Sequence, residues 1–216
     1  MNALDIRVVD DPSVAAAQWL ARRLRDAVRR RGSATLAVSG GSTAPPMFEA
    51  LRACDVPWDR TTIWQVDERV APAGDRDRNA EQLQGLPSRI RLMPVTSKDL
   101  RAAARRYAAS LPDRFDIVHL GMGGDGHTAS WPPGDSVVDS TRAVEVTGEF
   151  NGRRRMTLTP LVVNAARARL VLTVGSSKAA MVERWMERDA EVPIDRVRRA
   201  GTIVFLDQEA ASRLSV

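Results

Sequence analysis

Apolar segments typical of buried β-strands alternate with amphipathic helical segments along almost the whole chain of 216 residues. The expected strands cover residues 5–9, 34–39, 61–67, 115–121, 168–175 and 201–207. The expected helices cover residues 12–31, 44–53, 97–111 and 177–188, with a further helix after residue 207. Strands connected by helices pair in parallel, because each helix carries the chain back along the sheet. The alternation therefore predicts one α/β domain over residues 1–216, with a mainly parallel, twisted sheet flanked by helices.

The basic residues are almost all arginines. The chain has 32 lysines and arginines against 27 acids, a net charge of +5, and its only lysines are Lys98 and Lys178. The arginines are interspersed with acids instead of aromatic side chains, which argues against a nucleic-acid partner. We expect the arginine runs at 29–31 and 153–155 to be solvated ends. A small anionic substrate needs only two or three of these charges.

No segment predicts export or membrane insertion. The first residues, "MNALDIRVVDD", lack the basic start and apolar core of a signal peptide. No apolar stretch reaches the length that a membrane helix needs. Cys54 is the only cysteine, which excludes internal disulfides and a cysteine-built metal site, and we expect it to be buried or half-buried. These features predict a cytoplasmic protein with no membrane partner.

The carboxyl ends of parallel strands are where ligands gather in such a sheet, and one expected strand ends in a glycine-rich loop. Residues 39–43, Ser-Gly-Gly-Ser-Thr, lead from strand 34–39 into a helix. The glycines let a ligand approach the backbone, and the helix N-terminus supplies free amides and a positive dipole end. The loop suits one phosphate, but it lacks a Walker lysine and so does not predict a nucleoside triphosphate. A plain tight turn into the helix is the alternative interpretation.

Charged residues follow two further strands. Asp67, Glu68 and Arg69 come at the end of strand 61–67, where they form either a surface ion cluster or part of a site. Lys178 follows strand 168–175 at the start of a helix. Its charge opposes the helix dipole, so stability does not require it there. Lys178 is therefore either solvated or in contact with an anion.

The stretch "VHLGMGGDGHTAS" carries glycines at 121, 123 and 126, the G-x-G-x-x-G spacing of a dinucleotide-binding turn. That turn must lead into a long helix, but the prolines at 132 and 133 end any helix here after about one turn. We therefore expect no nucleotide cofactor. The glycines are expected to form a tight shelf that presents Asp125 and His127 to a cleft. His119, inside the strand, is expected to be a packed or hydrogen-bonded core residue.

Several of these segments resemble the 6-phosphogluconolactonases of the glucosamine-6-phosphate isomerase/6-phosphogluconolactonase family. The matching motifs, in the family's order, are "LAVSGGSTAP", "VDERVAP" with the later Asn79, "LGMGGDGHTAS" followed by "PG", "RMTLT" with "NAAR", "VGSSKAAMV" and "FLDQEAA". They span about residues 5–211, and D-G-H-T-A-S together with D-E-R is the most specific part. The resemblance implies a Rossmann-like fold of the sugar-phosphate isomerase type.

The resemblance implies hydrolysis of 6-phospho-D-glucono-1,5-lactone to 6-phospho-D-gluconate, the second step of the oxidative pentose phosphate pathway. His127 would be the general base on the attacking water, because imidazole can take a proton and return it to the leaving ring oxygen. Asp125 would fix the shelf or the histidine, and Asp67 would orient groups in the cleft. Arg69 or amides of the shelf would donate to the oxyanion. The implied phosphate ligands are Gly40, Gly41, Ser42, Thr43, Lys178 and Arg155. No metal or cofactor is implied.

Two features leave room for other activities. Trp131 and Pro132 stand where the family usually has leucine and phenylalanine, and Gly124 stands where an acid is frequent, so we expect an altered rim of the cleft. Related glucosamine-6-phosphate deaminases share the fold and the phosphate loop, so a deaminase or isomerase acting on a sugar phosphate is one alternative. A non-enzymatic module that binds a sugar phosphate or nucleotide is another. No G-x-S-x-G motif is present, which argues against a serine acyl-enzyme.

Overall fold

The computed structural model describes residues 3–214, and its centre is a seven-stranded sheet in which all neighbouring strands are parallel. The strands are β1 (Asp5–Val8), β2 (Ala34–Val38), β3 (Thr61–Gln65), β5 (Arg89–Arg91), β6 (Ile117–Gly121), β9 (Ala168–Thr173) and β10 (Thr202–Leu206). Their order across the sheet is β1-β10-β9-β6-β2-β3-β5. The predicted α/β class with a mainly parallel sheet is therefore confirmed.

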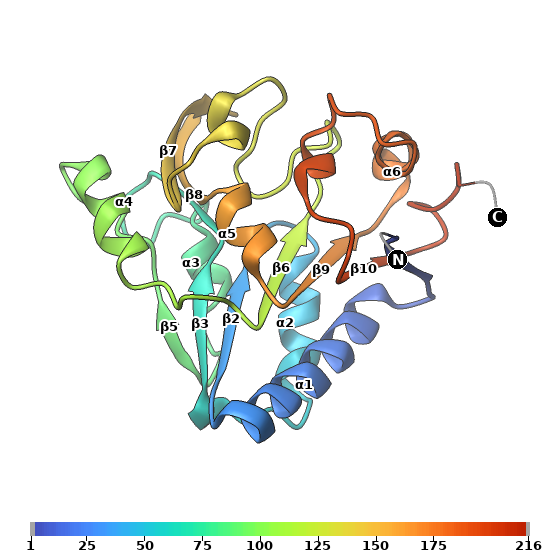
Figure 1. Ribbon diagram of the computed structural model, residues 1–216, viewed down its shortest axis with the longest axis horizontal. Helices are drawn as coiled ribbons and strands as arrows, with labels where there is room; N and C mark the ends of the chain where they lie inside the picture. Colours follow the sequence, from blue (N-terminus) through green and yellow to red (C-terminus); the bar gives the residue numbers. More distant parts are fainter. Residues whose placement is uncertain (1–2, 215–216) are drawn as a thin grey trace.

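The helices cover both faces of this sheet (Figure 1). They are α1 (Pro12–Arg31), α2 (Ala44–Arg52), α3 (Asn79–Gln82), α4 (Leu100–Ala108), α5 (Pro160–Ala165) and α6 (Ala179–Met186). One core joins α1 and α2 to the sheet through buried side chains such as Leu20, Phe48 and Leu170. The other core, which includes Val118 and Trp185, lies on the opposite face. The sheet is thus covered on both sides, as its continuous apolar strands require.

A second, antiparallel sheet of three strands lies over the carboxyl ends of β2, β3 and β6, toward which their arrows point in Figure 1. Its strands are β4 (Asp67–Arg69), β8 (Arg153–Leu158) and β7 (Val144–Phe150), in the order β4-β8-β7. Val66 links the two sheets, because its amide donates to Val38 at 2.8 Å and its carbonyl accepts from Leu158 at 2.7 Å. The charged residues 67–69, which we expected at the end of strand 61–67, therefore form the separate strand β4.

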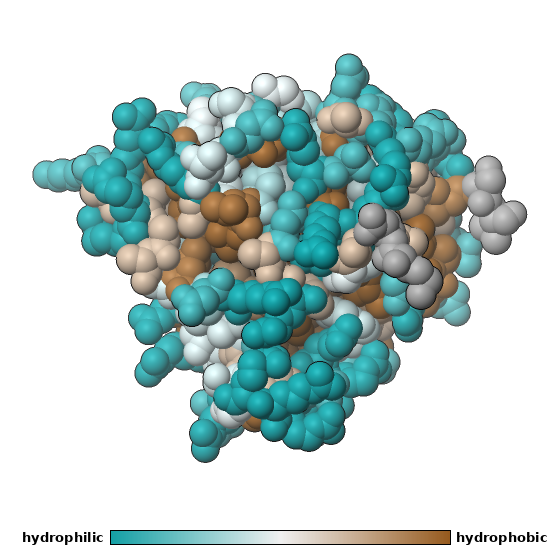
Figure 2. Space-filling model, viewed as in Figure 1, coloured by the Kyte–Doolittle hydropathy of each residue, from teal (hydrophilic) through white to brown (hydrophobic). Residues whose placement is uncertain are grey.

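The helix expected after residue 207 is wrong for the described residues. Residues 208–213 form successive turns, with the amides of Ser212 and Leu214 donating to carbonyls three residues back. Asp207 accepts the Gly175 and Ala210 amides, which fixes the start of the segment as a turn. No helix among residues 3–214 is long and apolar enough to cross a membrane. The face shown in Figure 2 is mostly hydrophilic, with an apolar area over α5, where Leu161 is exposed.

Candidate active site

A cavity of about 210 Å³ lies at the carboxyl ends of the central strands, beneath the small sheet. It is lined by Ser39, Gly40, Gly41, Ser42, Thr43, Asp67, Arg69, Asn79, Gly121, Met122, Gly123, His127, Thr128, Ala129, Arg155 and Lys178. All six expected phosphate ligands and three of the four expected catalytic residues therefore line one cavity. The fourth, Asp125, contacts His127 from beside it.

The glycines after β6 form a compact turn in which the histidine ring lies against the backbone. The Gly123 amide donates to the His127 carbonyl at 2.8 Å, and the Gly126 amide donates to the Gly123 carbonyl at 3.1 Å. A Cβ on Gly123 would come within 2.1 Å of the His127 ring, so only glycine leaves room for the imidazole there. Gly126 has a φ of +80°, a backbone conformation that glycine adopts without strain. Turns follow instead of the long helix that a dinucleotide-binding turn needs.

His127 and Asp125 form a close pair at this turn. The Nδ1 atom of His127 lies 2.5 Å from Asp125 Oδ1, which also accepts the His127 backbone amide at 3.1 Å. Partial burial would raise the pKa of Asp125, but the hydrogen bonds and charge of His127 outweigh it and lower that pKa. Asp125 is thus ionised at neutral pH. With Nδ1 engaged, Nε2 is the ring nitrogen left for a ligand.

The small sheet contributes a buried carboxyl group and two arginines to the cavity. Asp67 is buried and accepts a hydrogen bond from Ser130 Oγ at 2.8 Å. Burial raises the pKa of Asp67, against the opposing effects of Arg69, Ser130 and Arg155. Arg155 is itself buried, and the desolvation lowers the pKa of its guanidinium group. The Arg155 guanidinium lies 5.1 Å from the Phe150 ring centre, and that ring meets His127 edge-on.

The glycine-rich loop and Lys178 line the same cavity. Gly41 has a φ of +107°, and its amide donates to Gln82 Oε1 at 3.0 Å, so the Gln82 side chain holds this part of the loop. The Ser39 hydroxyl is buried and has no hydrogen-bond partner among residues 3–214. Lys178 ends a short 3-10 helix (Ser176–Lys178) just before α6, as expected from the sequence.

Two expectations about side-chain placement are wrong. Trp131 does not alter the rim, because its side chain is fully buried and its Nε1 donates to the Leu158 carbonyl at 2.8 Å. Arg155 is not a solvated end, because β8 carries it under the small sheet into the cavity. Gly124 does lie close to the cavity, since a Cβ there would be 3.7 Å from Lys178 Nζ.

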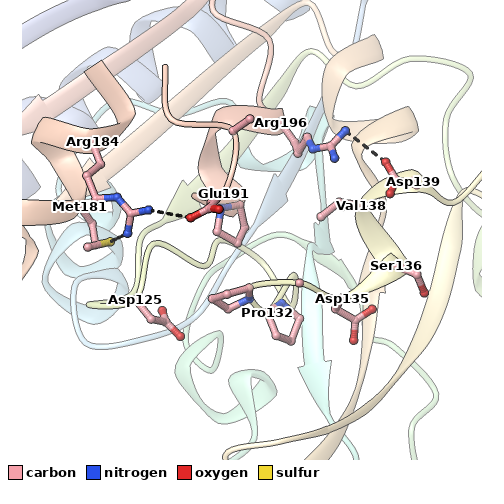
Figure 3. A pocket seen from close by; sticks show the side chains of 14 residues that line it. Asp125, Pro132, Asp135, Ser136, Val138, Asp139, Met181, Arg184, Glu191 and Arg196 are labelled. Atoms are coloured by element: carbon pink, nitrogen blue, oxygen red, sulfur yellow. Dashed lines mark hydrogen bonds and ion pairs between the residues drawn. The ribbon is translucent and has the colours of Figure 1, made fainter. Parts of the chain in front are cut away.

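Pro132 lines a separate, larger groove of about 750 Å³ that also contacts Asp125 (Figure 3). Figure 3 shows Asp125 and Pro132 on one side of this groove and Arg184, Glu191 and Arg196 on the other. Both arginines are already paired, Arg184 with Glu191 and Arg196 with Asp139. The groove thus presents no unpaired arginine to an anion.

The two residues expected in the interior behave as the sequence suggested. His119 is fully buried and packs edge-on against Phe48, and its ring nitrogens have no hydrogen-bond partner among the described residues. This burial lowers the pKa of His119 to about 3. Cys54 is half-buried with a free thiol.

Some residues at or beside the cavity were not assigned a role from the sequence. Asn79 and Ser130 appeared only as parts of motifs, and Phe150 had no signal. Phe150, on β7, packs against His127 and Arg155, which line the cavity, and Ser130 reaches Asp67 through the turn after His127. The contacts with His127 and Asp67 join segments far apart in the chain, which a single sequence does not reveal.

The fold and this cavity define an α/β protein with a polar small-molecule site at the carboxyl edge of a parallel sheet. Residues 10–205 match the model of the family described as glucosamine-6-phosphate isomerases/6-phosphogluconolactonase, and the chain belongs to this family. A 6-phosphogluconolactonase of Streptomyces coelicolor is 32% identical, over 93% of this chain and 89% of that protein.

Solved structures agree with this assignment. A 6-phosphogluconolactonase of Shewanella baltica is 26% identical, with a TM-score of 0.87 over 94% of this chain and 97% of that one. A monomeric glucosamine-6-phosphate deaminase shares the fold, with 23% identity and a TM-score of 0.81 over 97% and 99% of the two chains.

Proposed function

We propose that this chain hydrolyses 6-phospho-D-glucono-1,5-lactone to 6-phospho-D-gluconate, the second step of the oxidative pentose phosphate pathway. Membership of the family and relatives named 6-phosphogluconolactonase support an enzyme that acts on a lactone. The observation that carries the proposal is the Asp125–His127 pair at the cavity that also holds the glycine-rich loop and Lys178. A base and an anion-binding end in one small cavity suit an ester that carries a distant phosphate.

His127 would act as the general base through Nε2. It takes a proton from water as the water oxygen attacks the lactone carbonyl carbon. The tetrahedral intermediate then collapses, the bond from that carbon to the ring oxygen breaks, and the imidazolium returns the proton to the ring oxygen. Ionised Asp125 holds Nδ1 and stabilises the imidazolium between these two steps. The step needs no metal ion.

The oxyanion of the intermediate needs a donor, and Arg69 is the side chain that we assign to it, beside amides of the shelf. Asp67, held by Ser130, would orient Arg69 and Arg155. At the other end, the hydroxyls of Ser42 and Thr43 and the charge of Lys178 would hold the phosphate. Arg155 would support the same anionic substrate. The free Cys54 thiol fits a cytoplasmic enzyme.

The test is to follow lactone disappearance with and without the protein and to subtract spontaneous hydrolysis. Enzyme-dependent loss of the phosphorylated lactone, with proton release matching 6-phosphogluconate formation, is the expected result. Ammonia release from glucosamine 6-phosphate without lactone hydrolysis would instead identify a deaminase. Saturable NAD binding without turnover of either substrate would identify a binding module.

A further inference from the structure

We propose that Glu68 is a positioning residue that, through the short helix α3, fixes both the glycine-rich loop and Arg69 at the cavity. One side chain of α3, Gln82, holds the glycine-rich loop, and another, Asn79, holds Arg69. The proposal rests on the proposed lactonase function, because it assigns different steps of that reaction to the two contacts.

The Glu68 carboxylate fixes the start of α3. Its Oε1 accepts the Asn79 amide at 2.7 Å and the Arg69 amide at 2.8 Å, and its Oε2 accepts the Ala80 amide at 2.9 Å. A helix of four residues is not stable by itself, and its first amides have no partner within the helix. The carboxylate supplies those partners, so that α3 depends on Glu68 for its place beside the cavity.

Glu68 is fully buried, and its remaining contacts are polar. Gln65 Nε2 donates to Oε2 at 2.7 Å, and the buried Arg78 lies 3.0 Å from the same oxygen as an ion pair. A buried carboxylate with this many donors is a fixed anchor, because each donor would lose its partner if the carboxylate moved. The anchor joins β3, β4 and the segment before α3.

Asn79 links the Glu68 carboxylate to strand β4 and to Arg69. Its Nδ2 donates to the Asp67 carbonyl at 2.9 Å, and its Oδ1 accepts a hydrogen bond from Arg69 Nη1. Arg69 Nη1 also donates to the Asp77 carbonyl at 3.1 Å. These acceptors set the direction of the Arg69 guanidinium group, which we assign to the oxyanion.

Gln82 links α3 to the glycine-rich loop at residues 39–43. Its Oε1 accepts the Gly41 amide at 3.0 Å, and a Cβ on Gly40 would lie 2.9 Å from that oxygen and 2.1 Å from Asn79 Oδ1. The side chains of α3 therefore occupy the space that any larger residue at position 40 would need. The loop therefore packs directly against the helix that Glu68 holds in place.

The proposal predicts that loss of the Gln82 contact changes KM and that loss of the Asn79 contact changes kcat. Gln82→Ala should raise KM for the phosphorylated lactone about 3- to 10-fold with little change in kcat, because one hydrogen bond that orders the loop is lost. Asn79→Ala should lower kcat on the order of 10-fold or more, because Arg69 loses its orientation. Glu68→Gln should both raise KM and lower kcat, because the new side-chain amide places an N–H donor opposite backbone amides that need an acceptor. Glu81→Ala, on the same helix, is the matched control, since the Glu81 carboxylate bonds Gln84 and not the cavity.

Each outcome decides the proposal. A lower KM in Gln82→Ala would show that Gln82 competes with the phosphate, and unchanged kinetics in both α3 variants would show that α3 only packs; either result overturns it. If Glu68→Gln does not fold, Glu68→Asp, which keeps the charge but shortens the side chain, takes its place, and wild-type kcat and KM in that variant overturn the role of Glu68. If the wild-type protein does not hydrolyse the lactone, the proposed function fails. Binding of 6-phosphogluconate then tests the loop contact separately, with weaker binding expected in Gln82→Ala and equal binding overturning the loop role.

Discussion

Oδ1 of Asp125 contacts both the ring and the backbone of His127, with Nδ1 at 2.5 Å and the amide nitrogen at 3.1 Å. One carboxylate oxygen therefore fixes the orientation of the imidazole two residues along the chain. The Phe150 ring, whose centre lies 5.1 Å from that of His127, borders the imidazole from the small sheet. The ring nitrogen left for chemistry is Nε2.

Asp125→Asn should lower kcat on the order of 10- to 100-fold, because a neutral amide stabilises the imidazolium less than a carboxylate does. Steady-state hydrolysis of the lactone measures this effect. An unchanged kcat would show that Asp125 only shapes the turn.

Lys178→Ala should raise KM for the phosphorylated lactone about 10-fold or more, because a charged donor to the phosphate is lost. Hydrolysis of unphosphorylated gluconolactone should be almost unchanged. The two substrates are compared under the same conditions. Equal losses on both would assign Lys178 to folding or chemistry instead of phosphate recognition.

Gly123→Ala should lower kcat on the order of 100-fold, because its Cβ would overlap the His127 ring and displace the base. The matched control is Gly148→Ala, whose Cβ would meet nothing within 4 Å. Activity and thermal unfolding are measured for both variants. Wild-type kcat in a folded Gly123→Ala variant would show that the His127 ring does not pack against the Gly123 backbone in the active enzyme.

His119 predicts a specific acid sensitivity of folding. Its pKa is lowered to about 3 by burial, so below its unfolded value near 6.5 only the unfolded chain takes up the proton. The contribution of neutral His119 to the free energy of unfolding is therefore fully present above pH 6.5. It falls as the pH drops toward 3, by about 2 kcal/mol at pH 5. His119→Leu should remove this component. Urea unfolding at pH 7 and pH 5 compares the two proteins, and an equal loss in both would exclude His119 as its source.

The sequence predicted the inner strands of the central sheet because they are buried on both faces and read as continuous apolar runs. It missed the edge strand β5, Arg89–Arg91, which is short and largely exposed. It missed the three-stranded sheet, because strands such as Asp67–Arg69 and Arg153–Leu158 begin in charged residues that resemble solvated ends. Those charges are in the interior only because the two sheets meet there. Trp131 was misplaced for a similar reason: its indole N–H finds a carbonyl on β8, a partner distant in the chain.

The site was predictable where glycines and strand ends coincide, since a parallel sheet brings its carboxyl ends to one edge. The loop at 39–43, the shelf at 121–126 and Lys178 all follow this rule. Glu68 and Gln82 do not, because their importance lies in hydrogen bonds between the segment around α3 and two different strands' ends. Contacts of that kind follow from the folded arrangement and not from local pattern.

The central claim is that His127 is the general base, and turnover by His127→Asn tests it most directly. The variant keeps a similar polar shape but cannot transfer the proton, so kcat should fall on the order of 10²- to 10⁴-fold while competitive binding of 6-phosphogluconate is largely retained. His119→Asn is the control, and its folded fraction should turn over normally. Near wild-type kcat in a folded His127→Asn protein would contradict the account.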